Sequence, residues 1–257
     1  MPQWIAVSRT EHADRYYQPR QGYGFASEQA ATPILQAELS KLLPHYTLAF
    51  VPQGLGYQAV ALLSLDGQKN LYVHSDGRWL GTYVPASLRG YPFTLANTED
   101  SKTVLCVDQS QLSSESGGAL FNADGELNEP VARTLDFLQQ CEKNRQVTAA
   151  ATQALAEAGV IEAWPLKLNT AEGQEPVPVN GLYRINEQAL NNLDDDAYAK
   201  LRGGPMALAH AQLFSMSQLN QLTDRVKFHD KHTAGKEDPV DLEDLFGDDD
   251  DDLSFNF

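Results

Sequence analysis

The sequence contains few cysteines and no long hydrophobic run. Cys106 and Cys141 are the only cysteines among 257 residues, and they do not form a CxxC pair. This usage is typical of a reducing compartment, where both serve as small core residues rather than as a disulfide. No stretch reaches the roughly 18 to 20 apolar residues that span a bilayer, and the N-terminus lacks a signal-peptide run. We therefore expect a cytoplasmic protein that does not bind membranes.

Basic residues are also scarce. The chain has 19 Lys and Arg against 35 Asp and Glu, which gives a formal net charge of -16. Ten of the acids lie in residues 236–257, beside a single lysine. Because a negative surface repels phosphates and no basic patch is interleaved with aromatics, the composition disfavours nucleic-acid binding.

Motifs of catalysis and of cofactor binding are missing as well. No Gly-x-Ser-x-Gly elbow, Walker loop or Gly-x-Gly-x-x-Gly occurs, and both cysteines lie in apolar contexts that disfavour a thiolate. His229 and His232 have a His-x-x-His spacing, but no third ligand is evident, and a solvated pair is the better interpretation. We expect no cofactor and no bound metal.

The hydrophobic pattern predicts an α+β fold with an antiparallel β-meander core and flanking helices. Short β-rich runs are separated by Asp-Gly and other turn sequences, because glycine accepts the positive φ that hairpin turns need. The predicted strands are residues 48–51, 57–65, 70–73, 79–84, 104–107, 164–168 and 182–185. Helices are predicted over residues 32–43 and from 129 to Gly159, the latter with a break near Asn144.

The C-terminal part predicts an amphipathic helix followed by an acidic tail. Apolar residues recur at steps of three and four from Met206 to Val226. Beyond Phe228 too few apolar groups remain to offset the ordering entropy. We expect three regions: an irregular N-terminal arm packed on the body (1–29), one domain (30–230) and a disordered acidic tail (231–257).

Several blocks of the chain resemble one known family. The longest is NLYVHSDGRWLGTYVPASLRGYPF (residues 70–93), and others are LCVDQSQL (105–112), GGALFNADGE (117–126), GLYRINEQALNNL (181–193) and HAQLFSMSQLNQL (210–222). In this order they resemble the SapC family of S-layer-associated proteins, over residues 30–222. Gly90 stands where a second basic residue is common, and the acidic tail is not a regular family feature.

The resemblance implies a setting rather than a reaction. The family takes its name from a surface-layer locus, and its relatives lie near genes for flavin-dependent halogenase-like, cupin-like and outer-membrane receptor proteins. These associations imply a role in envelope, S-layer or protein-modification pathways. They supply no catalytic residues that can be transferred to this sequence, so a non-catalytic binding or accessory protein is the preferred hypothesis.

An aromatic and arginine-rich block within residues 70–93 is the candidate binding site. Arginines beside ring faces can bind a carboxylate, so the block can form a peptide-binding groove along a sheet edge. The alternative is that the aromatic rings fill the core and each arginine pairs with an acid such as Asp108. The candidate residues are Arg78, Trp79, Tyr83, Arg89, Tyr91 and Phe93.

Two other functions stay open at this point. One is an enzyme whose site is assembled from Arg89, Tyr91, Asp108 and His210 around one pocket, because catalytic groups are recognised by geometry rather than by spacing. The other is a structural component of an S-layer.

The acidic tail carries apolar side chains that can dock on a protein partner. Leu245, Phe246, Phe255 and Phe257 lie among carboxylates, which keep such a segment soluble while its apolar groups remain available to a basic-rimmed pocket. The alternative is a solubilising run without a partner.

Overall fold

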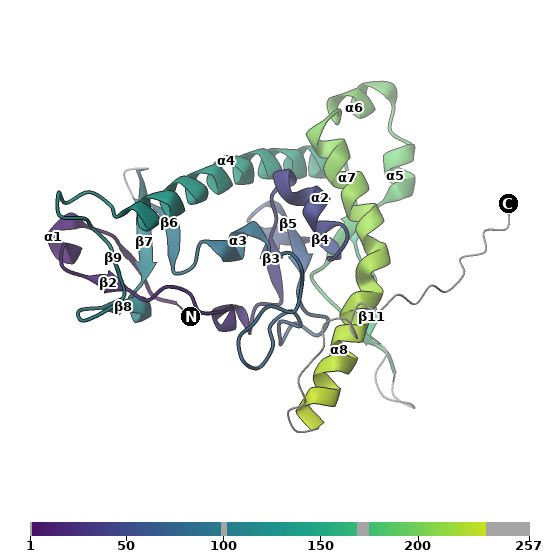
Figure 1. Ribbon diagram of the computed structural model, residues 1–257. Helices are drawn as coiled ribbons and strands as arrows, with labels where there is room; N and C mark the ends of the chain where they lie inside the picture. The colour runs from purple at the N-terminus through teal and green to yellow at the C-terminus, as the bar shows by residue number, and fades with distance from the viewer. Residues whose placement is uncertain (1, 99–101, 169–174, 235–257) are drawn as a thin grey trace.

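The computed structural model describes residues 2–98, 102–168 and 175–234, apart from the side chains of residues 168 and 232–234. Its helices and antiparallel sheets confirm the predicted α+β class. The long helix α4 (Glu129–Glu157) crosses from strands β6 and β7 at one end to helix α7 at the other (Figure 1). Among the described residues, no helix combines the length and the apolar character needed to cross a membrane.

The larger sheet is built around one hairpin. Its five strands, in spatial order, are β10 (Ile161–Ala163), β13 (Tyr183–Ile185), β4 (Leu48–Gln53), β5 (Gly56–Leu62) and β3 (Ala31–Pro33). The β4–β5 turn contains Gly54 at φ +58°, a conformation that side chains with a Cβ rarely adopt. Strands from distant parts of the chain, β3 on one side and β13 on the other, complete the sheet.

Three smaller sheets accompany it. Their strands are β1 (Trp4–Ala6), β7 (Thr103–Asp108) and β6 (Phe93–Asn97); β8 (Leu112–Ser113), β2 (Tyr16–Tyr17) and β9 (Gly118–Ala119); and β11 (Lys167–Leu168) with β12 (Val177–Pro178). A turn follows residue 122: Gly125 has φ +75°, and the amide of Glu126 donates to Asn122 Oδ1.

The N-terminal residues and the first predicted helix differ from their predictions. The segment predicted as an irregular arm contains β1, which pairs with β7, and β2, which pairs with β8 and β9. Strands of two or three residues are too short to leave a period in the sequence. The helix predicted over residues 32–43 begins later, because residues 31–33 form β3; only η2 (Gln36–Glu38) and α2 (Leu39–Leu42) are helical.

The predicted strands 70–73 and 79–84 are also wrong. This stretch is irregular apart from one bridge between Val73 and Trp79, and it ends in the short helix α3 (Ala86–Arg89). Its apolar side chains enter the core from loops, so β-like composition did not mean sheet pairing.

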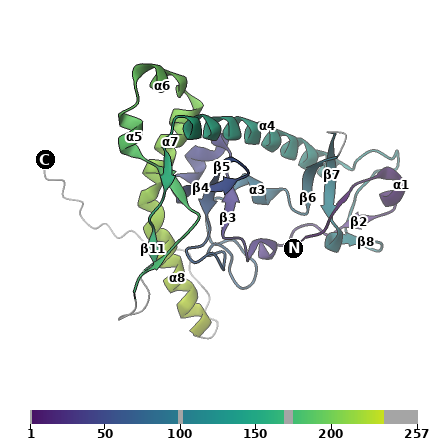
Figure 2. The ribbon, with the colours of Figure 1, turned by 180° about the vertical axis from the view of Figure 1, so that it is seen from behind.

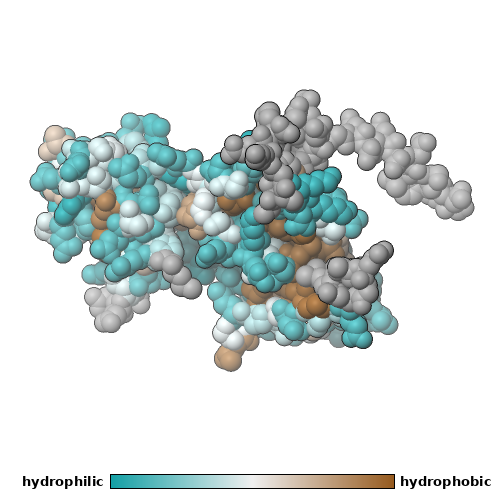
Figure 3. All heavy atoms as spheres, turned by 90° about the horizontal axis from the view of Figure 1, so that it is seen from below, coloured by the Kyte–Doolittle hydropathy of each residue, from teal (hydrophilic) through white to brown (hydrophobic). Residues whose placement is uncertain are grey.

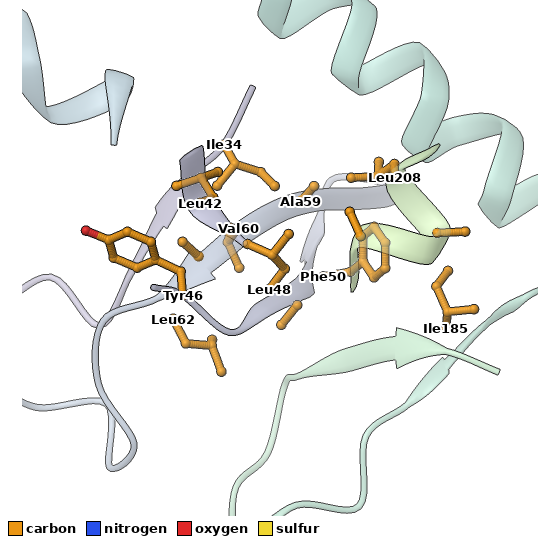
Figure 4. Packing of buried hydrophobic residues seen from close by; sticks show 14 of the residues in the cluster. Ile34, Leu42, Tyr46, Leu48, Phe50, Ala59, Val60, Leu62, Ile185 and Leu208 are labelled. Carbon is orange, nitrogen blue, oxygen red and sulfur yellow. The ribbon is translucent and has the colours of Figure 1, made fainter. Parts of the chain in front are cut away.

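Helix α4 joins two hydrophobic cores. Its first turns place Val131 in a smaller core against the β1–β7–β6 sheet, and its last turns place Ala151 and Leu155 in the larger one. Figure 4 shows part of the larger core, to which Leu48 and Phe50 contribute from one face of the β4–β5 hairpin and Val60 from the other. The helix is continuous through Asn144, where a break was predicted, and Gly159 at φ +69° follows its end as predicted.

The C-terminal helices pack against the larger core (Figure 2). They are α7 (Gly204–Ser215), the turn η4 (Met216–Gln218) and α8 (Leu219–Ala234), so the predicted helix is confirmed and continues to Ala234. Gln212 accepts from the Ile185 amide and donates to the Leu48 carbonyl, which fixes α7 to strands β13 and β4. Of the predicted disordered tail (231–257), residues 231–234 belong to α8 instead, and residues 235–257 lie outside the described residues.

The remaining helical elements are short. They are α1 (Arg9–His12), η1 (Gly24–Ala26), η3 (Gln109–Gln111), α5 (Glu187–Asn191) and α6 (Asp195–Lys200). Of these, η1 and η3 border a cavity described below.

Candidate functional site

Trp79 is held inside the structure rather than on a groove. Its ring stacks on Tyr72 with centroids 5.6 Å apart and meets the edge of Tyr23 at 5.2 Å. Its Nε1 donates to Tyr46 Oη at 3.2 Å and to the Tyr83 carbonyl at 3.1 Å. The ring is partly buried, and with its N–H and one face engaged by protein groups it has little left to offer a ligand.

Phe93 and Arg78 lie apart from Trp79. Phe93 is 3% exposed and packs edge-on against Tyr17 in the smaller core. Arg78 is exposed and pairs with Asp76 at 3.3 Å. The six predicted residues therefore do not line one continuous groove.

Tyr83 and Arg89 belong to a network around the buried Glu38. Tyr83 Oη donates to Glu38 Oε2 at 2.8 Å, and the amides of Leu35 and Ala86 donate to the two oxygens of the same carboxylate. Arg89 Nη2 donates to Tyr83 Oη at 3.2 Å. Burial, together with Glu38, raises the pKa of Tyr83 to about 12, so its hydroxyl remains a donor. No sequence signal marked Glu38, which is one acid in an ordinary polar segment.

Tyr91 and Asp108 form a second polar pair, and they border a cavity. Tyr91 Oη donates to Asp108 Oδ2 at 2.9 Å, and the amide of Ser110 donates to Oδ1 at 3.1 Å. The Tyr91 ring stacks flat on Phe25, with centroids 4.0 Å apart and planes 6° from parallel. Burial and the neighbouring Asp108 raise the pKa of Tyr91 to about 12, which keeps the phenol protonated.

This cavity has a volume of about 860 Å³ and a negative lining. It is lined by Pro2, Gln3, Phe25, Glu28, Gln29, Tyr91, Asp108, Gln109 and Ser110. Among these described residues there are two carboxylates and no Lys, Arg or His. We refer to it as the Tyr91 cavity. Its walls come from η1, β7 and η3, so segments far apart in the sequence build it.

The four residues of the enzyme hypothesis do not meet in this cavity. Arg89 lies over the rings of Phe137 and Tyr83 instead. His210 is exposed on α7, where its Nδ1 lies 3.0 Å from the Met206 carbonyl. Within the part of the chain that the structure describes, the site is reduced to Tyr91 and Asp108.

A second cavity of about 540 Å³ lies against α8. We refer to it as the α8 cavity. It is lined by Leu65, Asp66, Lys69, Leu71, Leu166, Lys167, Leu219, Thr223, Val226, His229 and Asp230. Seen from below, hydrophobic side chains gather on the half of the molecule that carries α8 (Figure 3).

His229 is buried in this cavity's wall, so its predicted exposure was wrong. The residue is 8% exposed, and its Nε2 lies 3.1 Å from the Leu71 carbonyl. Burial, more than the nearby Lys69, lowers its pKa. The irregular loop before Leu71 packs on α8 and covers the ring, a long-range contact that periodicity does not report.

Among the described side chains, no group of three or more His, Cys, Asp or Glu is arranged to hold a metal ion. Both cysteines are free, and burial raises the pKa of each thiol.

No curated protein and no solved structure matches the chain. The SapC family model matches residues 7–222, which include both polar networks but only the first turn of α8. The chain therefore belongs to the SapC family.

Proposed function

We propose that the protein is a non-catalytic binding protein that holds a cationic group of a peptide or protein partner in the Tyr91 cavity. The observation that carries this proposal is the buried Asp108 carboxylate, which lies at a cavity with aromatic and acidic walls and no basic residue among those described. An ammonium or guanidinium group would supply the charge that this lining lacks.

Asp108 has acceptor capacity to spare. Its carboxylate receives one hydrogen bond from Tyr91 and one from the Ser110 amide, and both donors are neutral. An ionised carboxylate has about four acceptor positions, so a cationic donor can still bind. Charge-assisted hydrogen bonds of this kind are about twice as strong as neutral ones.

The aromatic wall favours the same ligand class. Tyr91 and Phe25 are stacked and both line the cavity. The stacked faces of these rings cover each other, so a cation would meet an outer ring face, where the attraction is about 0.5 to 1 kcal/mol at exposed sites and about 2 kcal/mol when water is excluded. Glu28, exposed at the same cavity, adds a second negative charge that attracts cations and repels anions.

The size and the remaining lining suit a peptide rather than a single ion. A volume of about 860 Å³ falls in the range of ligand pockets. Gln3, Gln29 and Gln109 offer side-chain amides, which can both donate to and accept from an extended peptide backbone.

Binding of synthetic peptides tests the proposal. Hexapeptides that differ at one position, with Arg, Lys or the neutral Gln, are titrated into the full chain and followed by calorimetry and by chemical shifts. We expect the cationic peptides to bind at least about tenfold more tightly than the Gln peptide. Asp108→Asn should remove this preference, while Glu129→Gln, on the exposed start of α4, should leave it unchanged. Equal binding of all three peptides would refute the cation site.

The wider setting follows from family membership and remains a proposal. The envelope, S-layer or protein-modification pathways implied by the resemblance would provide the partner, and the negative charge of the chain argues against nucleic acid. A cytoplasmic location is also a prediction. Fractionation of native cells checks it, and recovery with the surface layer would favour the structural alternative.

A further inference from the structure

The α8 cavity combines an apolar floor with two lysines. Leu65, Leu71, Leu166, Leu219 and Val226 contribute its apolar walls. Lys69 and Lys167 lie at the same cavity, and among the described ion pairs neither lysine has a carboxylate partner. Apolar walls with a few placed charges are the usual composition of a docking site for a short amphipathic segment.

We propose that the occupant is the chain's own segment 241–246, with the sequence DLEDLF, and that it docks in the α8 cavity of the same molecule. Leu242, Leu245 and Phe246 would fill the apolar space. The acids between them, Glu243 and Asp244, would pair with the two lysines. This site is separate from the Tyr91 cavity and does not depend on the function proposed for it.

The charges around the cavity leave the lysines available for such pairing. Asp66 is engaged within its own loop, because its Oδ1 accepts from Ser64 Oγ at 2.8 Å and from the Gln68 amide at 2.9 Å. Asp230 is exposed on the outer part of α8. Lys69 Nζ lies 3.3 Å from His229 Nδ1, a neighbour that does not neutralise its charge. The cavity therefore has two lysines that an acidic segment can pair with, in a lining whose two lysines and two aspartates sum to no net charge.

The residues between α8 and the DLEDLF segment are enough to reach back to the cavity. Val226, which lines the cavity, precedes Ala234 by eight residues, about 12 Å along a helix at 1.5 Å per residue. The seven residues between Ala234 and Leu242 span up to about 25 Å when extended. A tether of this length also gives an effective concentration on the order of millimolar, so a weak contact in cis is populated.

The end of the chain provides a matched comparison. Residues 253–257 (LSFNF) carry a similar number of apolar groups, but five consecutive aspartates precede them and they lie farther from α8. A general attraction between acidic residues and lysines would bring both segments to the cavity equally. Specific docking would bring residues 241–246 there and not residues 253–257.

Zero-length carbodiimide cross-linking of the full chain tests the proposal. The reagent joins a carboxylate directly to a lysine amine, so mass spectrometry should detect links from Lys69 or Lys167 to Glu243 or Asp244. In a mixture of ¹⁴N- and ¹⁵N-labelled protein, these links should join peptides of one label. The triple variant L242A/L245A/F246A should reduce them about tenfold, because three apolar contacts are lost. The control triple variant L253A/F255A/F257A should not reduce them.

Three results would overturn the proposal. These are the absence of links from either lysine to Glu243 or Asp244, equal yields in the two triple variants, and links between differently labelled chains. The second would reduce the contact to charge alone, and the third would place the segment on another copy. Circular dichroism checks that both variants fold like the unaltered protein.

Discussion

The guanidinium carbon of Arg225 lies 4.0 Å from the centroid of the Tyr72 ring, and its Nη1 donates to the Leu80 carbonyl. One buried cation of α8 thus holds two points of the irregular stretch 70–84. Burial raises the pKa of Tyr72 to about 12 although Arg225 acts to lower it, so the phenol remains protonated and donates to the His45 carbonyl. This stretch, which has one β-bridge and no named strand, is therefore held in place largely by polar and aromatic contacts.

Replacing Arg225 should destabilise the protein strongly. Arg225→Ala removes the buried cation from the Tyr72 ring and leaves the Leu80 carbonyl without this donor, so the free energy of unfolding should fall by about 3 kcal/mol. Arg225→Lys keeps the charge, so its free energy of unfolding should fall less than that of Arg225→Ala. Urea denaturation measures both, with the exposed Arg133→Ala as control, for which we expect a change within about 0.5 kcal/mol. A similar loss for Arg133→Ala and Arg225→Ala would contradict this role.

Replacing the Glu38 carboxylate should also lower the free energy of unfolding. It accepts from the Leu35 and Ala86 amides and from Tyr83 Oη, and an amide in its place can satisfy only part of these donors. We expect Glu38→Gln to lower the free energy of unfolding by about 2 to 3 kcal/mol. Tyr83→Phe, which removes one of the three donors, should cost about 1 kcal/mol. Equal losses in denaturation experiments would show that the two amides contribute little.

The parts of the fold that could be predicted are those with local signals. The β4–β5 hairpin has two β-rich apolar runs and a glycine turn, and α4 has Asn128 as its cap and Gly159 after its end. Residues 70–84 misled the prediction because their aromatic and β-branched side chains pack into the core from loops. Composition indicates burial there, but it does not decide whether a buried segment pairs in a sheet.

The candidate site could be predicted only in part, for a related reason. Tyr91 and Asp108 were both singled out, yet the cavity also needs Phe25 and Glu28 from the N-terminal segment, and no local pattern connects these positions. His229 was misjudged because its environment is created by the loop before Leu71. Sites assembled across long sequence separations become visible only once the topology is known.

Gly90 has a packing role that its position in the aromatic block does not reveal. A Cβ at this residue would lie 2.5 Å from Leu138 Cδ2 and 3.3 Å from the Phe93 carbonyl oxygen. Its φ of -75° is open to any residue, so the constraint is space rather than backbone strain. Gly90→Ala should therefore lower the free energy of unfolding by about 1 to 3 kcal/mol.

A double-mutant cycle separates this contact from other effects. Leu138→Ala removes the side chain that the new Cβ meets, so G90A/L138A should be more stable than the sum of the single losses implies, by about 1 kcal/mol or more. Chemical denaturation of the four proteins measures this coupling. If the losses of the two single variants simply add in the double variant, the clash with Leu138 is not the reason that Gly90→Ala destabilises the protein.

His229 should make stability depend on pH. Burial lowers its pKa in the folded state below the ordinary 6.5, so at neutral pH the ring is uncharged in both folded and unfolded chains. As the pH falls below about 6.5, the unfolded chain binds a proton that the folded chain does not, and the free energy of unfolding decreases. We therefore expect stability to be lost from pH 7.5 to 5.5.

The variant His229→Gln tests this assignment, because its amide can still donate to the Leu71 carbonyl but cannot titrate. Its free energy of unfolding should fall less between pH 7.5 and 5.5 than that of the unaltered protein. Burial also lowers the pKa of His45, so His45→Gln should likewise reduce the loss of unfolding free energy between pH 7.5 and 5.5. The double variant should lose the least unfolding free energy over this range. Urea titrations at the two pH values measure the four slopes. If His229→Gln keeps the full slope, the ring is not the group that binds the proton.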